Sequence, residues 1–481
     1  MDEPGAGASG ADAEGSGAPD LLIRGALVVT MNPAREVYDP GFVAVKGGRI
    51  AAVGPEAECP DGTSPAAAVL DGRDRIVLPG FVNAHDHLLG AFSRGLGSDR
   101  AVAVTVPDAS ERLAARIRGA IDEEAAYAAA RLSLLELQLS GVTTTADSQP
   151  ALAGREANAD ATLRALHESG ARALWTRASL NRTGYVAPGQ HDSLDVALAE
   201  LERLAGRWSS GRVEVGCEAQ ALHRVEEDLL RGLAEWAEGR GAHFAMHLSY
   251  SEEAALHAVE RFGRPLLLLL EEWGVLGPRF LGYHPVWLSD EEIDAAARSG
   301  AGLAFCPVDN MLIASGVAPV ARLLAAGCRL GLGVDQPNDG HNVFELMKLS
   351  VLIQRVAHLD ASLGGPEQAL ELATLGGARA LHREHELGSL EPGKAADLVV
   401  LDGRRPAFAP FPGRISNLVY AAGPADVEHV FVAGEAVVRS GRHALWDGED
   451  VVSEAHRAMR ATLGRAGLPE DLGPYTSWPL S

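Results

Sequence analysis

Two histidines separated by a single residue follow an apolar run near the beginning of the chain. The run "RIVLPGFV" leads into "NAHDH", which places His85 and His87 at the end of a predicted strand. Side chains at positions i and i+2 of a strand point to the same face, so both imidazoles could bind one metal ion. Such pairs also occur by chance in buried strands, and the metal interpretation therefore requires further ligands elsewhere in the chain.

Three later residues each end an apolar run of the same kind. His247 ends "AHFAMH", His284 ends "RFLGYH" and Asp335 ends "RLGLGVD". If these runs are the parallel strands of a barrel, their carboxyl ends meet at one face, which is where barrel enzymes carry their chemistry. Together with the first two histidines, these residues would form one polar site.

The middle of the chain, residues 78–380, alternates short apolar runs with longer amphipathic segments. Runs such as "GVTTTADS" and "RVEVGCEAQ" stand next to residues with helical spacing, as in "VEEDLLRGLAEWAEGRG". The segment "SDEEIDAAARSG" opens with the Ser-x-x-Glu pattern of a helix N-terminus. About seven or eight such units fit a (β/α)8 barrel, and no glycine-rich phosphate loop favours a doubly wound sheet.

The two segments that flank this middle part have a different composition and spacing of apolar residues. "DLLIRGALVVT" near the start and "VEHVFVAGEAVVRSGR" near the end are rich in Val, Ile and Leu and are bounded by turn signals. We predict one small β-sandwich built from both chain ends, residues 20–77 and 381–450. Residues 1–19, rich in Gly, Ala, Ser and Asp, are predicted to be a disordered tail, and residues 451–481 a C-terminal helix and tail.

The charge of the chain limits its partners. Its 481 residues include 42 Lys and Arg against 65 Asp and Glu, a formal net charge of -23. Because such a charge repels phosphate backbones and anionic membranes, we expect neither nucleic acid nor membrane as a partner and favour a small molecule. Four cysteines without CxxC spacing suggest no disulfide framework and no thiolate zinc site. A cytoplasmic location fits this pattern and the lack of a secretory signal.

A series of longer motifs follows in order along the chain. They are "LPGFVNAHDHL" at 78–88, "SGVTTTAD" at 140–147, "MHLSYSEE" at 246–253, "CPVDNMLIASG" at 306–316, "GLGVD" at 331–335 and "LGSLEPGKAADLVVLD" at 387–402. This series resembles the amidohydrolase superfamily, in particular its branch of nucleobase and triazine deaminases and chlorohydrolases. The resemblance implies an α/β fold with a TIM-like (β/α)8 barrel and a small β-sandwich domain.

The resemblance also implies a site with one metal ion. It places a single divalent ion on His85, His87, His247 and Asp335, a donor set that suits Zn²⁺, with Fe²⁺ or Mn²⁺ as alternatives. His284 matches the residue that orients the attacking water and stabilises charge on the substrate. Asp335 can accept the proton of that water and pass it to the leaving group. No strand end offers a lysine that could bridge a second ion.

One position departs from the deaminase pattern. Deaminases of this branch carry a glutamate three residues after the histidine of the fifth strand, whereas this chain has Tyr250 there. A phenol with a pKa near ~10 cannot shuttle a proton to a ring nitrogen as a carboxylate does. The nearby Glu252 and Glu253 are expected to begin a helix instead.

This departure shapes the expected function. We favour hydrolysis of a non-peptide C–N bond of amide, urea, carbamate or amidine type, catalysed by Asp335 and His284, with Tyr250 supporting the oxyanion. The first alternative is an aminohydrolase (deaminase) or chlorohydrolase that acts on an N-heterocycle. The second, of a different class, is a barrel that serves only as a non-catalytic scaffold.

Further residues are candidates for substrate contacts. Arg94 follows the first strand, and its alternative role is a salt bridge that braces the first loop. Gln220 ends the fourth strand, where a polar loop pair with His223 is the alternative. His341 follows the last strand and reaches either the pocket or the surface.

The seventh strand brings a second departure from the pattern. Asp309 stands where similar proteins usually have serine, directly before Asn310. Its carboxylate favours a substrate with a basic or amino group, or else it caps the loop at Asn310. We count both residues among the candidate substrate contacts. Similar proteins are frequently homodimers, so the resemblance also suggests a dimer.

Overall fold

The computed structural model describes residues 18–59, 66–94, 116–151, 155–182, 191–337, 340–411 and 413–468. The predicted N-terminal tail lies almost wholly outside these residues, as does the predicted C-terminal tail after residue 468. Within the described ranges, α16 (Gly448–Arg465) supplies a helix at the C-terminal end, as predicted. No helix of this part of the chain is both long and apolar enough to cross a membrane.

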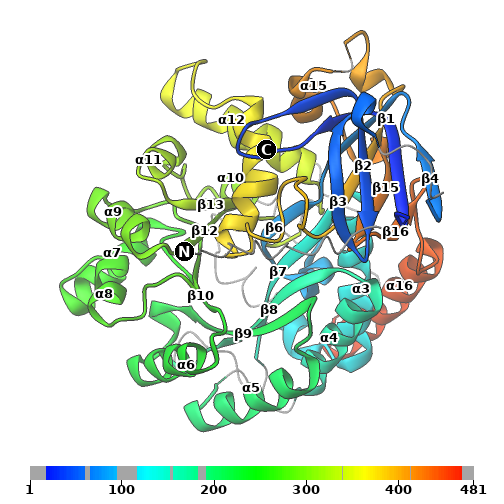
Figure 1. Cartoon of the computed structure of the whole chain (residues 1–481). Coiled ribbons are helices and arrows are strands. Elements are labelled where there is room, and N and C mark those ends of the chain that lie inside the picture. The colour runs from blue at the N-terminus through cyan, green and yellow to red at the C-terminus, as the bar shows by residue number, and fades with distance from the viewer. Residues whose placement is uncertain are drawn as a thin grey trace, which may run out of the picture.

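Eight parallel strands form a barrel at the centre of the molecule (Figure 1). Each pairs with its neighbours in chain order, and a bridge between Asp86 and Asp335 closes the barrel. The predicted (β/α)8 barrel is therefore confirmed. Its strands are β6 (Phe81–Asp86), β7 (Val142–Pro150), β8 (Arg172–Ser179), β9 (Val213–Ala221), β10 (Phe244–His247), β11 (Phe280–Tyr283), β12 (Gly302–Phe305) and β13 (Arg329–Leu332).

Helices cover the outside of the barrel (Figure 1). Asp122, Ser193 and Ser251 begin three of them, because each side chain accepts a hydrogen bond from the backbone N–H three residues on. The predicted capping box is present, since Ser289 and Glu292 each bond the backbone of the other. The helices are α3 (Glu123–Leu139), α4 (Ala157–Ser169), α5 (Leu194–Trp208), α6 (Glu227–Arg240), α7 (Glu252–Phe262), α8 (Leu266–Glu272), α9 (Asp290–Ser299), α10 (Pro307–Leu312), α11 (Val320–Ala325), α12 (Val343–His358), α13 (Pro366–Glu371) and α14 (Gly377–Ala380).

A second sheet takes strands from both chain ends. β5 pairs with β14, and all nine strands are hydrogen-bonded as one mixed sheet that is separate from the barrel. This confirms the small β-domain built from both ends, while its exact boundaries stay a prediction. Its strands are β1 (Leu21–Val29), β2 (Val37–Lys46), β3 (Arg49–Pro55), β4 (Ala68–Asp71), β5 (Arg75–Pro79), β14 (Leu398–Asp402), β15 (Val427–Val432), β16 (Glu435–Arg439) and β17 (Arg442–His443), with α15 (Ile415–Tyr420) between β14 and β15.

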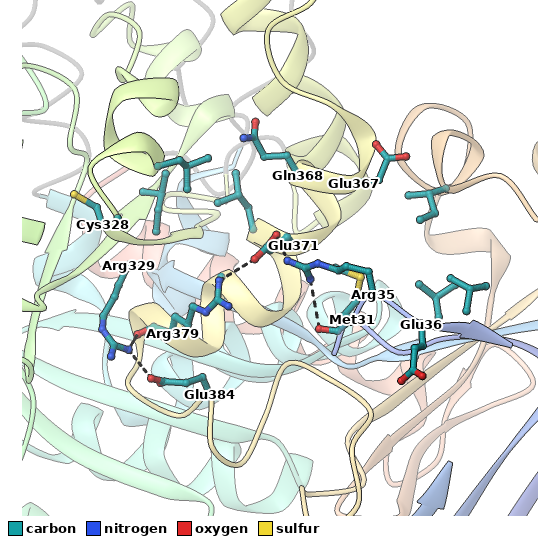
Figure 2. A pocket seen from close by; sticks show the side chains of 18 residues that line it. Met31, Arg35, Glu36, Cys328, Arg329, Glu367, Gln368, Glu371, Arg379 and Glu384 are labelled. Atoms are coloured by element: carbon teal, nitrogen blue, oxygen red, sulfur yellow. Dashed lines mark hydrogen bonds and ion pairs between the residues drawn. The ribbon is translucent and has the colours of Figure 1, made fainter. Parts of the chain in front are cut away.

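A cavity of about 670 Å³ lies beside the beginning of β13, at the amino ends of the barrel strands. Each arginine labelled in Figure 2 pairs with a glutamate: Arg329 with Glu384, and both Arg35 and Arg379 with Glu371. The arginines that line this cavity are thus already neutralised. The cavity is therefore a poor candidate for the chemistry, which is expected at the carboxyl ends of the strands.

Candidate metal centre

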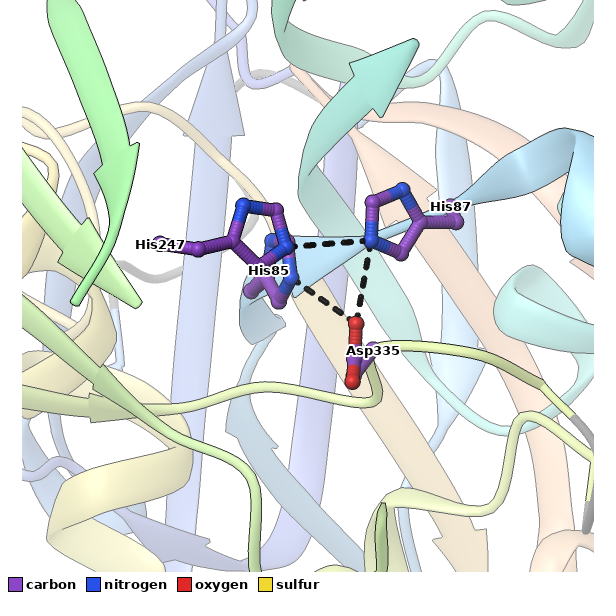
Figure 3. Close-up of side chains that lie close together, drawn as sticks. All are labelled: His85, His87, His247 and Asp335. Carbon is purple, nitrogen blue, oxygen red and sulfur yellow. Dashed lines mark hydrogen bonds and ion pairs between the residues drawn. The ribbon is translucent and has the colours of Figure 1, made fainter. Parts of the chain in front are cut away.

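The four residues predicted to bind a metal lie together at the carboxyl ends of the barrel strands (Figure 3). His85 belongs to β6, His87 follows it directly, His247 ends β10, and Asp335 comes shortly after β13. One possible ligand atom from each residue lies within 4.8 Å of the others, and all four residues are buried. The fold thus brings together side chains from three distant parts of the chain.

The spacing of these atoms fits a tetrahedral site. His87 Nε2 lies 3.3 Å from His247 Nε2, and Asp335 Oδ1 lies 2.9 Å from His85 Nε2 and 3.1 Å from His87 Nε2. Tetrahedral bonds of ~2.0–2.1 Å separate neighbouring ligand atoms by about 3.3 Å. Apart from the contact of His85 Nε2 with Asp335, the ring nitrogens of the buried His85 have no partner within the described residues, so this ring can act as a ligand.

Two of the histidines have their Nδ1 atoms against oxygens and their Nε2 atoms turned to one another. His87 Nδ1 lies 2.7 Å from the Ser148 carbonyl oxygen. His247 Nδ1 lies 3.1 Å from both Glu218 Oε1 and the Gln220 carbonyl oxygen. These oxygens only accept, so each Nδ1 carries a proton. Burial acts to lower the pKa of His87, but Asp335, with Oδ1 at 3.1 Å from His87 Nε2, outweighs it and raises the pKa to about 9, so a metal ion bound there would displace the Nε2 proton. The two Nε2 atoms lie 3.3 Å apart, and the donor set fits one divalent ion.

His284 lies beside this group, directly after β11. Asn310 Nδ2 donates a hydrogen bond to His284 Nδ1 at 3.0 Å. The imidazole proton is therefore on Nε2, which faces Asp335 Oδ2 at 3.4 Å. Burial lowers the pKa of His284 to about 4, so the ring is neutral at pH 7. It can donate one hydrogen bond to a group bound next to Asp335.

Closure of the barrel sets the position of Asp335. Its backbone N–H donates to the His85 carbonyl oxygen at 3.0 Å, and its own carbonyl oxygen accepts from the His87 N–H at 3.2 Å. A Cβ on Gly333 would lie 2.8 Å from His85 Cβ, so glycine permits this approach. Burial acts to raise the pKa of the Asp335 carboxyl, but His284 and the neighbouring imidazoles hold it well below the usual value. Asp335 is thus ionised at neutral pH.

Both Asp335 and His284 have backbone angles that non-glycine residues seldom adopt. Their φ angles are 68° and 58°, in the left-handed region. Such a conformation is strained by on the order of 1–3 kcal/mol and persists only where the surroundings impose it, often at functional sites.

Tyr250 lies near His284, with ring centroids 6.3 Å apart. Its hydroxyl lies 3.1 Å from His223 Nε2, and Arg224 Nε donates to the same nitrogen at 3.2 Å. Because this nitrogen accepts, Tyr250 donates its proton and keeps its oxygen lone pairs. Burial and the adjacent Arg224 lower the pKa of His223 to about 3, so this imidazole is neutral at pH 7. Glu252 lies in the first turn of α7, as expected.

Two further predicted contacts also lie close to the histidines. Asp309, in the first turn of α10, forms a second buried group with His284 and Asp335, whose possible ligand atoms lie within 4.8 Å of one another. The side-chain oxygen of Gln220 is buried without a hydrogen-bond partner among the described residues. Their roles as substrate contacts stay predictions.

Arg94 and His341 belong to a charged network. Arg94 donates through Nη1 and Nη2 to the two oxygens of Glu136 at 2.8 and 2.7 Å. This supports the bracing role rather than substrate contact for Arg94. His341 contacts Glu136 Oε2 at 2.9 Å and Asp86 Oδ1 at 3.2 Å. The surface location considered for His341 is wrong, because its side chain has no exposed area. Both of its nitrogens are held by carboxylates, so it braces the segment that carries the first two candidate metal ligands.

Replacing His341 with glutamine is expected to remove a pH dependence of stability. Burial acts to lower the pKa of His341, but Asp86 and Glu136 outweigh it and raise the pKa to about 9. Protonated His341 therefore stabilises the folded state. This contribution to the free energy of unfolding, on the order of 3 kcal/mol, is complete below the unfolded-state pKa of ~6.5 and is lost as the pH rises through about 9. Denaturant unfolding between these two pH values measures it. If the native chain and His341→Gln lost equal stability over this pH range, the pH dependence would not come from His341.

Residues outside the predicted set complete the centre. Glu218, Glu136 and Asp86 were not singled out from the sequence, although each contacts a candidate residue. A signal existed for Glu218, because it is an acidic residue inside the apolar strand "VEVGCEAQA". Its partner, however, depends on which residue of the neighbouring strand lies beside it.

Fold and site together define a class of protein. A (β/α)8 barrel that gathers three imidazoles and a carboxylate at its strand ends has the architecture of a metal-dependent hydrolase. The chain belongs to the amidohydrolase family, whose sequence model matches residues 76–437.

Individual relatives agree with this family. A 5-methylthioadenosine/S-adenosylhomocysteine deaminase from Syntrophobacter fumaroxidans is 32% identical over 93% of this chain and 99% of that protein. A 5'-deoxyadenosine deaminase from Methanosarcina mazei is 29% identical over the same shares. Among solved structures, an adenosine deaminase from Xanthomonas campestris with bound zinc has a TM-score of 0.85 at 25% identity, over 93% of this chain and 99% of its own. A triazine hydrolase from Arthrobacter aurescens has a TM-score of 0.84 at 25% identity, over 91% and 99%.

These relatives confirm the predicted class of enzyme. The chain is a metal-dependent hydrolase that acts on carbon–nitrogen bonds other than peptide bonds. The comparisons give no support to the alternative of a non-catalytic scaffold.

Proposed function

We propose that this chain uses one bound Zn²⁺ to hydrolyse a small molecule at a C–N bond of amide, urea, carbamate or amidine type. The observation that carries the proposal is Tyr250. Where similar deaminases have a carboxylate, this chain has a neutral phenol that donates to His223 at 3.1 Å. A carbon that already bears a polarised oxygen or a cationic nitrogen needs no ring protonation before water adds. Zinc is proposed because it suits three imidazoles and a carboxylate, and the Xanthomonas deaminase contains zinc.

A metal ion held by His85, His87, His247 and Asp335 would polarise the substrate and lower the pKa of a water towards ~7. The proton steps fall to the protein. Asp335 has Oδ1 turned to the histidines and Oδ2 turned to His284. Oδ2 can accept the proton of the attacking water and return it to the leaving nitrogen.

Charge that develops on the substrate is stabilised by hydrogen-bond donors. His284 donates from Nε2 to the atom that gains negative charge, and Asn310 holds it in that tautomer. Tyr250 turns its proton to His223 and its oxygen lone pairs can accept an N–H of the substrate. Asp309, buried next to His284, supports a substrate with a basic or amino group.

Deamination of an amino-heterocycle is the second candidate function. It is favoured by the deaminase relatives, the first of which is 32% identical over 93% of this chain. In that reaction a ring nitrogen must be protonated as water adds to the amino-bearing carbon, and a phenol with a pKa of ~10 is a poor proton shuttle. The first proposal therefore fits the site better.

A substrate panel separates the two candidates. Release of ammonia or amine is measured with amides, ureas, carbamates and amidines, and in parallel with aminopurines and aminotriazines. We expect turnover of at least one compound of the first group. Turnover of amino-heterocycles alone would contradict the proposal and establish deamination.

Replacing Tyr250 with glutamate is expected to move the activity towards amino-heterocycles. The new carboxylate could supply a proton to the ring nitrogen, and general acid–base catalysis contributes ~10²–10⁴-fold to rates. We expect the ratio of kcat/KM for amino-heterocycles to that for the native substrate to rise at least about tenfold. The control is Tyr250→Phe, which removes the hydroxyl without adding a carboxylate. The same shift in both variants would show that the missing carboxylate is not the cause.

A further inference from the structure

Glu218 is a buried acidic residue in β9 with no exposed area. Its Oε1 lies 3.1 Å from His247 Nδ1, and its Oε2 accepts a hydrogen bond from Thr176 Oγ1 at 2.9 Å. Within the described ranges, no lysine or arginine forms an ion pair with it. A carboxylate in such a place costs several kcal/mol of desolvation unless a positive charge compensates it.

The partner of Glu218 is also a candidate metal ligand. Glu218 Oε1 faces the Nδ1 side of the His247 ring, whereas Nε2 faces His87 Nε2 at 3.3 Å. The imidazole therefore lies between the carboxylate and the metal-binding group. A carboxylate in this arrangement fixes the tautomer of the histidine and makes its other nitrogen a stronger donor.

We propose that Glu218 is a positioning residue of the metal centre, and that Thr176 holds it in place. Glu218 shares with the Gln220 carbonyl oxygen the proton on His247 Nδ1. Its charge strengthens the other ring nitrogen as a ligand, and the cation balances this buried charge through the ring. This inference rests on the metal site of the proposed function. Its test measures metal binding, so it can succeed or fail independently of turnover.

The chain contains a matched control in the same two strands. Glu214 Oε1 lies 2.7 Å from Nδ1 of His243, which is also buried. Glu214 and His243 are as far apart in the sequence as Glu218 and His247, because each pair is 29 residues apart. Glu214 lies near the beginning of β9 and His243 directly before β10, so the control pair has similar chemistry away from the metal-binding group.

The test compares the zinc affinities of Glu218→Gln and Glu214→Gln. In the first variant the new side-chain amide would still accept from His247 and could donate to Thr176, so the change removes the charge with little change of shape. We expect the dissociation constant for Zn²⁺, measured by competition with a chromophoric chelator, to rise about 10–100-fold for Glu218→Gln. For Glu214→Gln we expect a change of less than about twofold. The Co²⁺ absorption spectrum should change only in the first variant.

The metal-free proteins give an independent readout. Without the ion, the buried carboxylate lacks its balancing charge, so Glu218→Gln should be at least as stable as the native chain in thermal unfolding. A residue that only supports the fold would give the opposite result. Thr176→Val leaves Glu218 in place but removes its hydrogen bond, and should weaken zinc binding by several-fold, less than Glu218→Gln.

Two outcomes would overturn the proposal. One is a Glu218→Gln protein that binds zinc as tightly as the native chain and as Glu214→Gln. The other is an equal loss of zinc affinity in both glutamine variants, since that would trace the effect to the strands and not to the metal centre. If Glu218→Gln does not fold, a Thr176→Val protein that binds zinc as tightly as the native chain would overturn the proposal.

Discussion

Replacing Asp335 with asparagine is expected to lower kcat by about 10³–10⁴-fold, because the group that accepts the proton of the attacking water is lost. Asparagine has the size of aspartate but neither its charge nor a basic oxygen. The carboxylate lies 2.9 Å from His85 Nε2 on one side and 3.4 Å from His284 Nε2 on the other. One substitution therefore affects both the metal ligand set and the proton path.

Metal content separates these two effects. The variant is assayed at saturating Zn²⁺, with bound metal measured on the same sample, and its folding is checked by circular dichroism. A loss of kcat in the metal-loaded variant supports the proton-transfer role. A metal-loaded Asp335→Asn protein that keeps more than about a tenth of the native kcat would contradict that role, since a general base contributes at least ~10²-fold.

Replacing His247 with alanine is expected to abolish stoichiometric metal binding and, with it, turnover. His247 supplies an Nε2 lone pair that faces His87 Nε2 at 3.3 Å, so its loss leaves at most three ligands. Removing a ligand from a site of this kind should reduce bound metal to less than about a tenth of an equivalent after dialysis.

His243→Ala is the matched control for this variant. His243 is buried four residues earlier in the same segment, but its ring contacts Glu214 and not the metal-binding group. We expect this variant to keep its metal, whatever its stability. Metal analysis of both proteins decides the point: equal retention would contradict the assignment of His247 as a ligand, and equal loss would trace the effect to the strand.

The arrangement of the strands explains how the sequence could predict which residues lie together in the candidate metal centre. His85, His247 and Asp335 each end an apolar run, and parallel strands of a barrel bring their carboxyl ends to one face. The period of two along a strand and the alternation of strands with helices predicted that these residues share one face with His284. Neither pattern depends on the detailed path of a loop. The resemblance to the amidohydrolase superfamily implied which of them would hold the ion.

The same reasoning could not predict which side chains of neighbouring strands contact each other. Glu218 bonds His247 because β9 and β10 pair in a particular register, which includes an irregularity between Ala245 and His247. The sequence shows an acidic residue in an apolar strand but not which side chain lies beside it.

Loop residues were predicted least well. His341 follows the last strand, which left the pocket and the surface as alternatives, yet it lies buried between Asp86 and Glu136. Arg94 pairs with the same Glu136. These contacts depend on how the loops after β6 and β13 fold back towards α3, and no periodic pattern in the sequence records that path.

The central claim is that one metal ion in this centre activates water for hydrolysis of a C–N bond. Its most direct test is a titration of Zn²⁺ into the metal-free protein while release of ammonia or amine from a substrate is followed. We expect activity to rise linearly to about one equivalent and then to stay constant, because His85, His87, His247 and Asp335 form a single set of ligands. Metal-free protein that hydrolyses the substrate at the full rate would contradict the claim.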